Sequence, residues 1–342
     1  MTLRSVTGWL VAVVAAIALT ANVVLPRNEA SANRPAAKSQ ESPGRGAPKK
    51  RQDSDALYDN VRAVVSHAAV LDNKDRIVDG LPPSVFHIFQ DGTERRLLIA
   101  GQEDSAARVT LVVDNSRSIA NANAVIHVAA VNFATAANPK DEFAVVSFDD
   151  QPKTVGEFTS EIADFEKQLP LEAPHGASAL WDALYAAVSE SSGSSDKSGV
   201  VVAFTDGGDN NSRHSVDDVR MLLQKTNVQL YAMMISDEDH RTFGLRHGQR
   251  SLANLCEATG GRAAMVYNAQ KLSAVTAQLS DEIRRRYTLG YLLDNQDADG
   301  RWRKIQVKLD PQPERGKLKV IAQPGYYGLA PQPQSATNPA IH

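Results

Sequence analysis

The sequence predicts an α/β fold with a central, mostly parallel sheet that is covered by helices on both faces. Between about residues 108 and 286, four short runs rich in β-branched and aliphatic residues occur: RVTLVV, FAVVSF, GVVVAFT and VQLYAMMI. Each run is followed by a stretch of helical periodicity, and such alternation is typical of a doubly wound parallel sheet. One of these stretches places Leu180, Leu184 and Val188 on one apolar stripe, as a helix that covers a sheet requires.

The segments on both sides of this region have the patterns of β-strands. Before it lie VRAVVSHAAVL and RIVDGL, separated by the polar turn DNKD, and then a predicted hairpin around Asp91-Gly92. After Arg286 come YTLGYLLD, RWRKIQVKL and KLKVIAQPGYYG. We therefore expect a small β-module at 55–105, the α/β domain at 106–286 and a C-terminal β segment at 287–328. Because both β segments flank the same domain, they are candidates for one common module.

The first 32 residues predict an export signal or a membrane anchor. A nearly uncharged apolar run extends from Trp9 to Pro26, and Ala30-Ser31-Ala32 has the small-residue arrangement that a signal peptidase accepts. The run is about 18 residues long, near the minimum for a membrane span, so both readings stay open. In either case we expect an exported protein that is periplasmic, extracellular or anchored facing outward.

Two further segments and the overall composition narrow the possibilities. Residues 33–54 are rich in Pro, Gly, Ser, Lys and Arg and predict a disordered basic linker, and residues 329–342 predict a disordered tail. The formal net charge of −3 gives no basic footprint for nucleic acid. Cys256 is the single cysteine, which excludes an internal disulfide, a cysteine zinc cluster and a CxxC redox pair.

The first predicted parallel strand ends in Asp114-Asn115-Ser116-Arg117-Ser118, directly before a helical stretch. Alternate residues of this run can direct one carboxylate and two hydroxyls to the same point above the sheet. Hard oxygen ligands of this kind suit Mg²⁺. The alternative is helix capping, which also favours Asp and Ser, and this run alone does not decide between the two.

Two other segments favour the metal. Gly176-Ala177-Ser178 precedes a helical stretch and offers a third hydroxyl, while the strand GVVVAFT leads into Asp206, a second carboxylate. Each segment alone would be an ordinary turn. All three nevertheless fall at strand ends or helix starts on what should be one edge of the sheet, where such folds bind ligands. The candidate metal ligands are Asp114, Ser116, Ser118, Ser178 and Asp206.

The strand end DNSRS, the segment GASALWDAL and the strand end FTDGGDN together resemble the three parts of the metal-ion-dependent adhesion site of von Willebrand factor A domains. The flanking segments SVFHIFQDGTERRLLIA and YTLGYLLD are similar to those of the exported bacterial group called von Willebrand factor A-related acidobacterial proteins. The likeness covers roughly residues 58 to 328. It implies a doubly wound, Rossmann-like domain flanked by a small β-sandwich-like module.

The resemblance also implies how an ion would be held. Ser116, Ser118 and Ser178 would coordinate Mg²⁺ (or Mn²⁺) through their hydroxyls, while Asp114 and Asp206 would bind directly or through water. A carboxylate from a protein partner would complete the coordination. Ser178 stands where the family usually has threonine, and it keeps the oxygen.

Two positions depart from the family pattern, because Arg117 and Ala177 both stand where the family has or prefers glycine. Arg117 would repel the ion, pair with an aspartate of the same edge, or grip an acidic partner. The aspartates in reach of such pairing are Asp149, Asp150 and Asp209. We assign Arg117, His175 and Asp209 to a partner-binding rim around the metal site.

The function that follows is a non-enzymatic adhesion or scaffold protein, with no catalytic residue and no nucleic-acid partner. A second hypothesis is a phosphotransferase of haloacid-dehalogenase type with Asp114 as nucleophile. Such an enzyme needs a second Asp two residues on as general acid, and Ser116 cannot protonate a leaving group near neutral pH. GxxxxGK, GxGxxG and GxSxG do not occur at a suitable strand end. A third hypothesis is a structural protein whose metal site is vestigial.

Overall fold

The computed structural model describes residues 63–102, 104–193, 197–235, 242–293 and 299–328. Apart from Ala63, these residues belong to one compact unit that begins at Val64. The predicted export segment 1–32, the linker 33–54 and the tail 329–342 lie outside the described residues. Within the described part of the chain, every helix is too short or too polar to span a bilayer.

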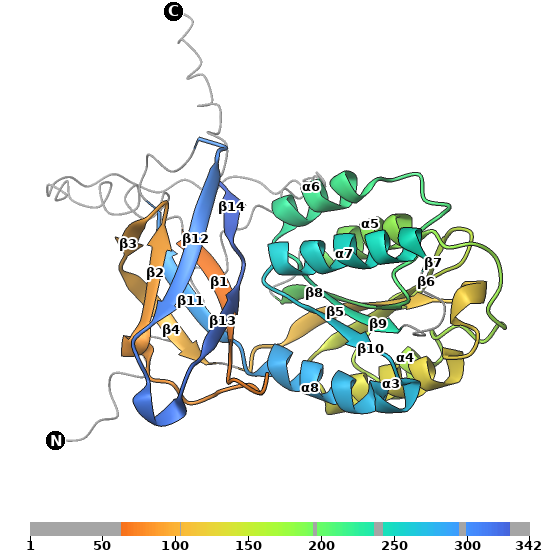
Figure 1. Ribbon diagram of the computed structural model, residues 1–342, viewed down its shortest axis with the longest axis horizontal. Coiled ribbons are helices and arrows are strands. Elements are labelled where there is room, and N and C mark those ends of the chain that lie inside the picture. Colours follow the sequence, from red (N-terminus) through yellow and green to blue (C-terminus); the bar gives the residue numbers. More distant parts are fainter. Residues whose placement is uncertain (1–62, 103, 194–196, 236–241, 294–298, 329–342) are drawn as a thin grey trace, which may run out of the picture. The chain divides into compact units, whose positions relative to one another are not determined.

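The larger domain is built on a six-stranded sheet with the order β10-β9-β8-β5-β6-β7 (Figure 1). Neighbouring strands are parallel from β10 to β6, and only the edge pair β6–β7 is antiparallel. This confirms the predicted central, mostly parallel sheet. The strands are β5 (Ala107–Asp114), β6 (Glu142–Phe148), β7 (Pro152–Thr159), β8 (Ser198–Thr205), β9 (Gln229–Ile235) and β10 (Ala263–Val266).

The four predicted runs form the four inner strands. The two edge strands, β7 and β10, were not predicted. The run FAVVSF is followed by β7 and not by a helix, so the expected alternation is wrong at this point. The reason is chemical: β7 carries Pro152, Lys153 and Gly156, which are tolerated where one side of a strand is unpaired. The other edge strand, β10, has only four residues.

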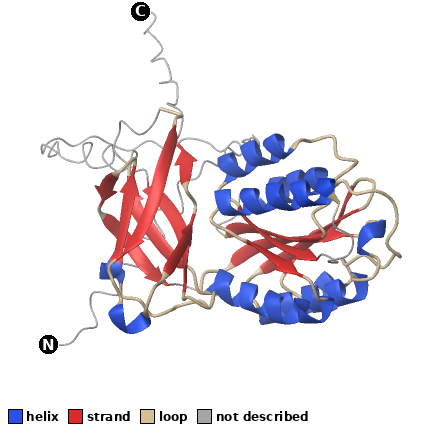
Figure 2. Ribbon diagram, viewed as in Figure 1, coloured by secondary structure: helices blue, strands red, loops and turns tan. Residues whose placement is uncertain are grey.

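Helices cover both faces of this sheet, as Figures 1 and 2 show. One face packs against α5 (Leu180–Ser191), α6 (Val216–Thr226) and α7 (Phe243–Ala258). The other packs against α3 (Asn123–Ala136), α4 (Ile162–Glu166) and α8 (Leu272–Arg284). Short 3₁₀ helices lie at Pro83–Val85 (η1), Arg117–Ile119 (η2), Ala269–Lys271 (η4) and Pro313–Arg315 (η6).

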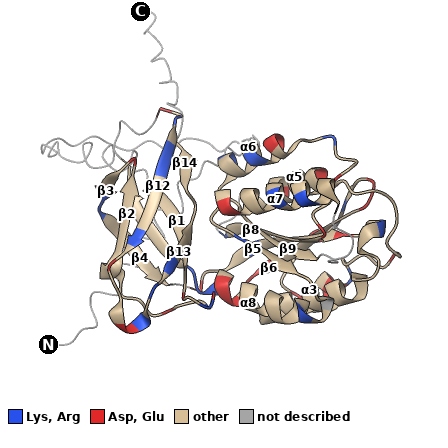
Figure 3. Cartoon of the chain, viewed as in Figure 1, with Lys and Arg blue, Asp and Glu red and all other residues tan. Residues whose placement is uncertain are grey.

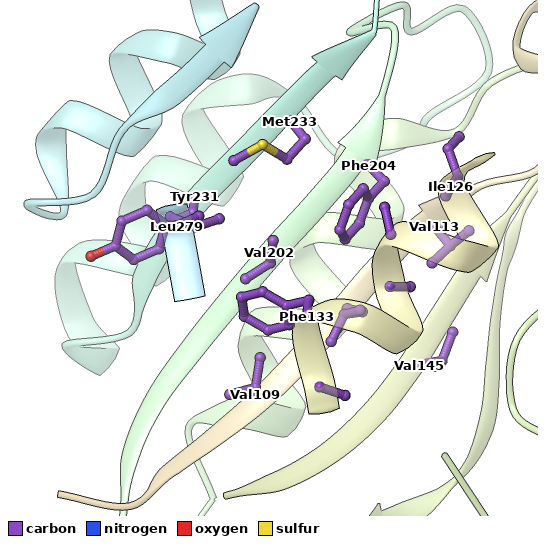
Figure 4. Close-up of a cluster of buried hydrophobic side chains, with 14 of the residues drawn as sticks. Val109, Val113, Ile126, Phe133, Val145, Val202, Phe204, Tyr231, Met233 and Leu279 are labelled. Atoms are coloured by element: carbon purple, nitrogen blue, oxygen red, sulfur yellow. The ribbon is translucent and has the colours of Figure 1, made fainter. Parts of the chain in front are cut away.

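The strands direct alternate side chains into two separate cores, as the period of a strand requires. In β8, Val202 and Phe204 join the core beneath α3 and α8, together with Phe133 and Tyr231 (Figure 4). Val201 of the same strand joins the core beneath α5, α6 and α7. The predicted apolar stripe of α5 lies in this second core, and its three residues are fully buried.

The segments before and after the α/β domain form two antiparallel four-stranded sheets, with the orders β13-β1-β11-β4 and β14-β12-β2-β3. Each sheet combines strands from both segments, and their shared core contains Ala68, Ile88, Tyr287, Tyr291 and Ile305. The flanking β-sandwich-like module is thereby confirmed. Its strands are β1 (Ala63–Leu71), β2 (Phe86–Gln90), β3 (Thr93–Arg95), β4 (Leu97–Gln102), β11 (Tyr287–Leu292), β12 (Trp302–Leu309), β13 (Lys319–Ala322) and β14 (Gly325–Tyr327).

The module confirms one predicted local feature and corrects another. Asp91 and Gly92 both have positive φ and join β2 to β3, as the predicted hairpin requires. The strand expected at RIVDGL does not form, and only a single bridge joins Ile77 to Leu71. Gly80 has a φ of 65° and turns the chain, so that Leu81 donates its N–H to the hydroxyl of Tyr287 at 3.0 Å.

Charged side chains of both signs are interspersed on the helices. Figure 3 shows both basic and acidic residues on α6 and on α7. This pattern matches the small net charge of −3.

Candidate metal-dependent binding site

The three polar segments meet at the carboxyl edge of the central sheet. Ser118, Ser178 and Asp206 line one cavity of about 680 Å³. Asp114 and Ser116 are buried and are joined to this group by hydrogen bonds. Residues as far apart as Asp114 and Asp206 are therefore neighbours, because β5 and β8 are adjacent parallel strands.

Asp114 is the last residue of β5 and is fully buried. One of its carboxylate oxygens accepts the backbone N–H of Ser116 at 2.9 Å. The other accepts the hydroxyl of Thr205 at 2.7 Å, and Thr205 immediately precedes Asp206. Thr205 thus ties the first segment to the third. Sequence reasoning missed it, because the neighbour of β5 in the sheet cannot be read from a local pattern.

The hydroxyl of Ser116 lies 3.1 Å from the hydroxyl of Ser118. Ser116 occupies the position before η2, but its side chain makes no capping hydrogen bond to that helix. The capping alternative is therefore wrong for Ser116. The pair of hydroxyls instead lies together, with Ser118 exposed on the cavity wall.

The loop that carries Ser178 is fixed from two sides. Gly176 has a φ of 72°, and a Cβ at this position would lie 2.8 Å from the Asp150 carboxylate, which accepts the N–H of Ala177 at 2.8 Å. Asn210 accepts the N–H of Ser178 through its side-chain oxygen at 2.9 Å and donates its own N–H to the Ser178 carbonyl. Ala177, where the family prefers glycine, is thus accommodated with its N–H satisfied.

Asp206 begins the third segment and is only partly buried. Its carboxylate accepts the N–H of Gly208 at 2.7 Å, and Gly207 adopts a φ of 87°. The segment packs tightly on α7, where a Cβ on Gly248 would lie 2.1 Å from the Gly207 carbonyl oxygen. Gln249 of α7 also donates to the Asp206 carbonyl at 2.8 Å. Sequence reasoning did not identify these α7 contacts.

The electrostatics of the site favour a cation. Burial, and after it the negative charge of Asp206, raises the pKa of Asp114 to about 6. Within the described residues, neither carboxylate forms an ion pair. A bound divalent ion would stabilise both ionised carboxylates, and two carboxylates with three hydroxyls are a hard-oxygen donor set of the kind that Mg²⁺ takes.

The candidate metal ligands include only two charged side chains, Asp114 and Asp206. Among the residues that the structure describes, no group of three or more His, Cys, Asp or Glu could hold a metal. Any ion here would depend on serine hydroxyls, which carry no charge. Such a site leaves the ion able to attract a further anionic ligand.

Arg117, one of the three residues assigned to the rim, does not line the cavity. Its side chain is exposed and forms no ion pair with any described residue. The aspartates considered as its partners are engaged elsewhere: Asp149 pairs with Lys153 at 2.8 Å, and Asp150 accepts the N–H of Ala177.

Asp209 and His175 lie at different places on the rim. Asp209 lines the cavity, but its carboxylate accepts the Ser212 hydroxyl at 2.5 Å and faces the start of α5, and burial raises its pKa. His175 is exposed, donates its backbone N–H to the Asn115 carbonyl at 2.9 Å and approaches Asp149 at 3.6 Å. His175 therefore lies beside the first segment and does not line the cavity.

Comparison with known proteins assigns the α/β domain to a family. Residues 109–208, which span β5 to β8 and include all five candidate ligands, match the family model described as the von Willebrand factor type A domain. The match over these residues confirms the resemblance to von Willebrand factor A domains that the three motifs predicted. A comparison with curated protein sequences finds no match.

Solved structures from several organisms align with this chain at low sequence identity. A von Willebrand factor type A protein from Catenulispora acidiphila aligns over 79% of this chain and 75% of its own, with 10% identity and a TM-score of 0.47. BatB from Bacteroides thetaiotaomicron aligns over 52% of this chain and 98% of its own, with 14% identity and a TM-score of 0.41. Proximal thread matrix protein 1 from the mussel byssus, with a zinc-occupied MIDAS motif, aligns over 57% of this chain and 49% of its own. The sequence identity is 22% and the TM-score is 0.45.

Proposed function

We propose that this protein is an exported, non-enzymatic adhesion or scaffold protein that recognises an acidic group of a partner protein through a divalent cation. The ion, Mg²⁺ or Mn²⁺, is held by the two carboxylates and three hydroxyls described above. The observation that carries the proposal is the convergence of Ser118, Ser178 and Asp206 on one cavity, with buried Asp114 directly behind them.

The chemistry of the donor set supports recognition of an acid. Two carboxylates balance the charge of a divalent ion at most, and the remaining ligands are neutral hydroxyls or waters. A carboxylate from a partner replaces a water on the ion and gains a strong electrostatic contact. Exposed Arg117 adds a second cationic contact at the same rim.

The enzymatic alternative lacks its general acid. Ser116 stands where a phosphotransferase of the haloacid-dehalogenase type needs an aspartate, and its hydroxyl lies against that of Ser118. Asp114 is fully buried, and its oxygens accept the Thr205 hydroxyl and the Ser116 N–H, which disfavours an in-line attack on phosphorus. Phosphatase turnover that disappears in Asp114→Asn would contradict the proposal.

Export rests on the amino-terminal sequence, which predicts a cleaved signal or an outward-facing anchor. Fractionation of cells that express the full chain tests this part separately. We expect the protein in the envelope or the medium, and recovery in the cytosol alone would contradict it.

Isothermal calorimetry with Mg²⁺ and Mn²⁺ tests the metal site. We expect saturable heat with the wild-type protein and none with Asp114→Ala. Asp217→Ala, on the exposed surface of α6, serves as the matched control and should bind as the wild type does. The absence of any metal-dependent heat in the wild type would support the third hypothesis, a vestigial site.

A further inference from the structure

The cavity at the metal site is larger than an ion and a carboxylate need. Its volume is about 680 Å³, whereas a water molecule in the liquid takes up about 30 Å³. Pockets of about 300–1,000 Å³ hold whole small ligands. The space beside the candidate ion is therefore sufficient for a second chemical group of the same ligand.

The walls of this cavity indicate which kind of group fits there. Besides the oxygens of the metal site and other polar residues such as Asn121 and Thr242, the cavity is lined by the large apolar side chains of Ile119, Ile235 and Leu245 and by the ring of Tyr267. Ile235 ends β9 and Tyr267 follows β10, so this part of the wall continues along the sheet edge from β8 towards β10. Apolar surface thus lies directly beside the hydroxyl-rich site.

The charges of the cavity limit where an anion can lie. Its charged lining residues, within the described part of the chain, are Asp206 and Asp209, and no Lys, Arg or His lines it. Asp206 and Asp209 disfavour an acidic group beside them unless the ion compensates its charge. The remaining space favours an uncharged group, and apolar walls favour an apolar one.

We propose that this cavity is a second subsite, which takes a large apolar side chain of the same partner segment that places its acid on the ion. This inference rests on the proposed function and specifies its ligand. In an extended segment, side chains two positions apart face the same side at about 6.6–6.8 Å. The partner is therefore an extended stretch with Asp or Glu two residues from Leu, Met, Phe or Trp.

Exposed aromatic residues at the rim are consistent with such a ligand. Phe243, the first residue of α7, is 84% exposed and stands between the lining residues Thr242 and Gly244. Tyr267, which lines the cavity and follows β10, is half-exposed. A bound apolar side chain would cover part of the exposed ring of Phe243.

A displayed library of random heptapeptides tests the inference. The full protein is immobilised with Mg²⁺, and bound phage are eluted with chelator. We expect the eluted sequences to combine an acidic residue with a large apolar residue two positions away. For a selected peptide, replacing the apolar residue by Ala should weaken binding at least about tenfold.

Two cavity variants and one control locate the apolar contact. Leu245→Glu replaces an apolar lining residue by a charged one at the third position of α7, where Glu is well tolerated in helices. Gly244→Phe fills the cavity without adding charge, since a Cβ there meets no atom within 4 Å. Met221→Glu, on the exposed side of α6, is the matched control.

The outcomes separate this inference from the proposed function. The subsite is supported if both cavity variants bind the selected peptide and its Ala-substituted form equally well, while Met221→Glu still prefers the selected peptide. Chelator-eluted peptides that share only an acid overturn the subsite and leave the metal-dependent function intact. If no peptide depends on Mg²⁺, both proposals fail.

Discussion

At the scale of single residues, Thr205 decides how well Asp114 is held. Its hydroxyl donates to the Asp114 carboxylate at 2.7 Å, and partners of metal-binding side chains commonly affect affinity by about 10–100-fold. We therefore expect Thr205→Val to weaken Mg²⁺ binding about tenfold in calorimetry while the protein stays folded. Thr226→Val removes a helical hydroxyl on α6 and serves as control. Equal affinity in Thr205→Val and wild type would show that the hydrogen bond plays no part in metal binding.

The raised pKa of Asp114 gives a second prediction at this scale. Because the pKa is about 6 in the folded protein and 3.8 in the unfolded chain, this group's contribution to stability is complete below pH 3.8 and is lost as the pH rises through 6. The loss amounts to about 3 kcal/mol at 1.36 kcal/mol per pH unit. In chelator at pH 7.5, Asp114→Asn should therefore unfold at higher urea concentration than wild type.

Saturating Mg²⁺ should reverse that order, because the ion stabilises only the ionised carboxylate of the wild type. Asn can replace Asp here without a clash, since its side-chain oxygen still accepts from Ser116 and the Thr205 hydroxyl can accept from its amide. If Asp114→Asn is less stable than wild type in chelator at pH 7.5, the ionised Asp114 carboxylate does not destabilise the metal-free protein, and the prediction is wrong.

The candidate ligands could be predicted from sequence, while the groups that fix them could not. Asp114, Ser116 and Ser118 alternate within one short run, and Asp206 ends another hydrophobic run, so local pattern and the carboxyl-edge rule suffice. The residues that join the segments, such as Thr205 and Asn210, act across long sequence distances. Their role depends on the strand order, which no local pattern contains. That the five residues bind a metal stays a prediction.

At the scale of elements, the packing of α7 against the Asp206 segment controls the shape of the site. Gly248→Ala would place its Cβ 2.1 Å from the Gly207 carbonyl oxygen, so the segment or the helix must move. We expect a loss of about 1–3 kcal/mol of stability in urea unfolding and weaker Mg²⁺ binding.

Gly244→Ala on the same helix is the matched control. Its Cβ meets no atom within 4 Å, and Ala favours the helix over Gly by up to about 1 kcal/mol. This variant should therefore be as stable as wild type or more so. Equal destabilisation by both substitutions would show that the close approach at Gly248 is not what matters.

The elements that sequence reasoning missed share a physical cause. Inner strands such as β5 and β8 are buried on both faces and appear as continuous apolar runs. The edge strand β7 pairs on one side only and tolerates polar residues and glycine, so its pattern is weak. At RIVDGL a strand was predicted but does not form. The chain turns at Gly80, and the apolar residues of this segment pack without joining a sheet.

At the scale of the whole molecule, stability should fall in acid because of His67 in β1. Burial, and after it the positive charge of Arg286, lowers the pKa of His67 to about 3. This group's contribution to stability is complete above pH 6.5 and is lost as the pH falls from there towards 3, at up to about 1.4 kcal/mol per pH unit. Urea unfolding in saturating Mg²⁺ should show the protein less stable at pH 5 than at pH 7.

His67→Gln removes the titrating group and should flatten this pH dependence. Magnesium is needed in the measurement, because Asp114 gives the opposite slope between pH 4 and 6 when no ion is bound. The same slope in wild type and His67→Gln would assign the acid sensitivity to another group.

The molecule as a whole combines a von Willebrand factor A domain with a sandwich built from both of its flanking segments. In the proposed function, five side chains from three segments of this domain hold one divalent ion. A crystal structure of the protein soaked in Mn²⁺, with anomalous scattering recorded, tests the claim most directly. We predict one strong anomalous peak among the hydroxyls of Ser116, Ser118 and Ser178, close to both carboxylates. Well-ordered density for these side chains with no anomalous peak between them would contradict the account.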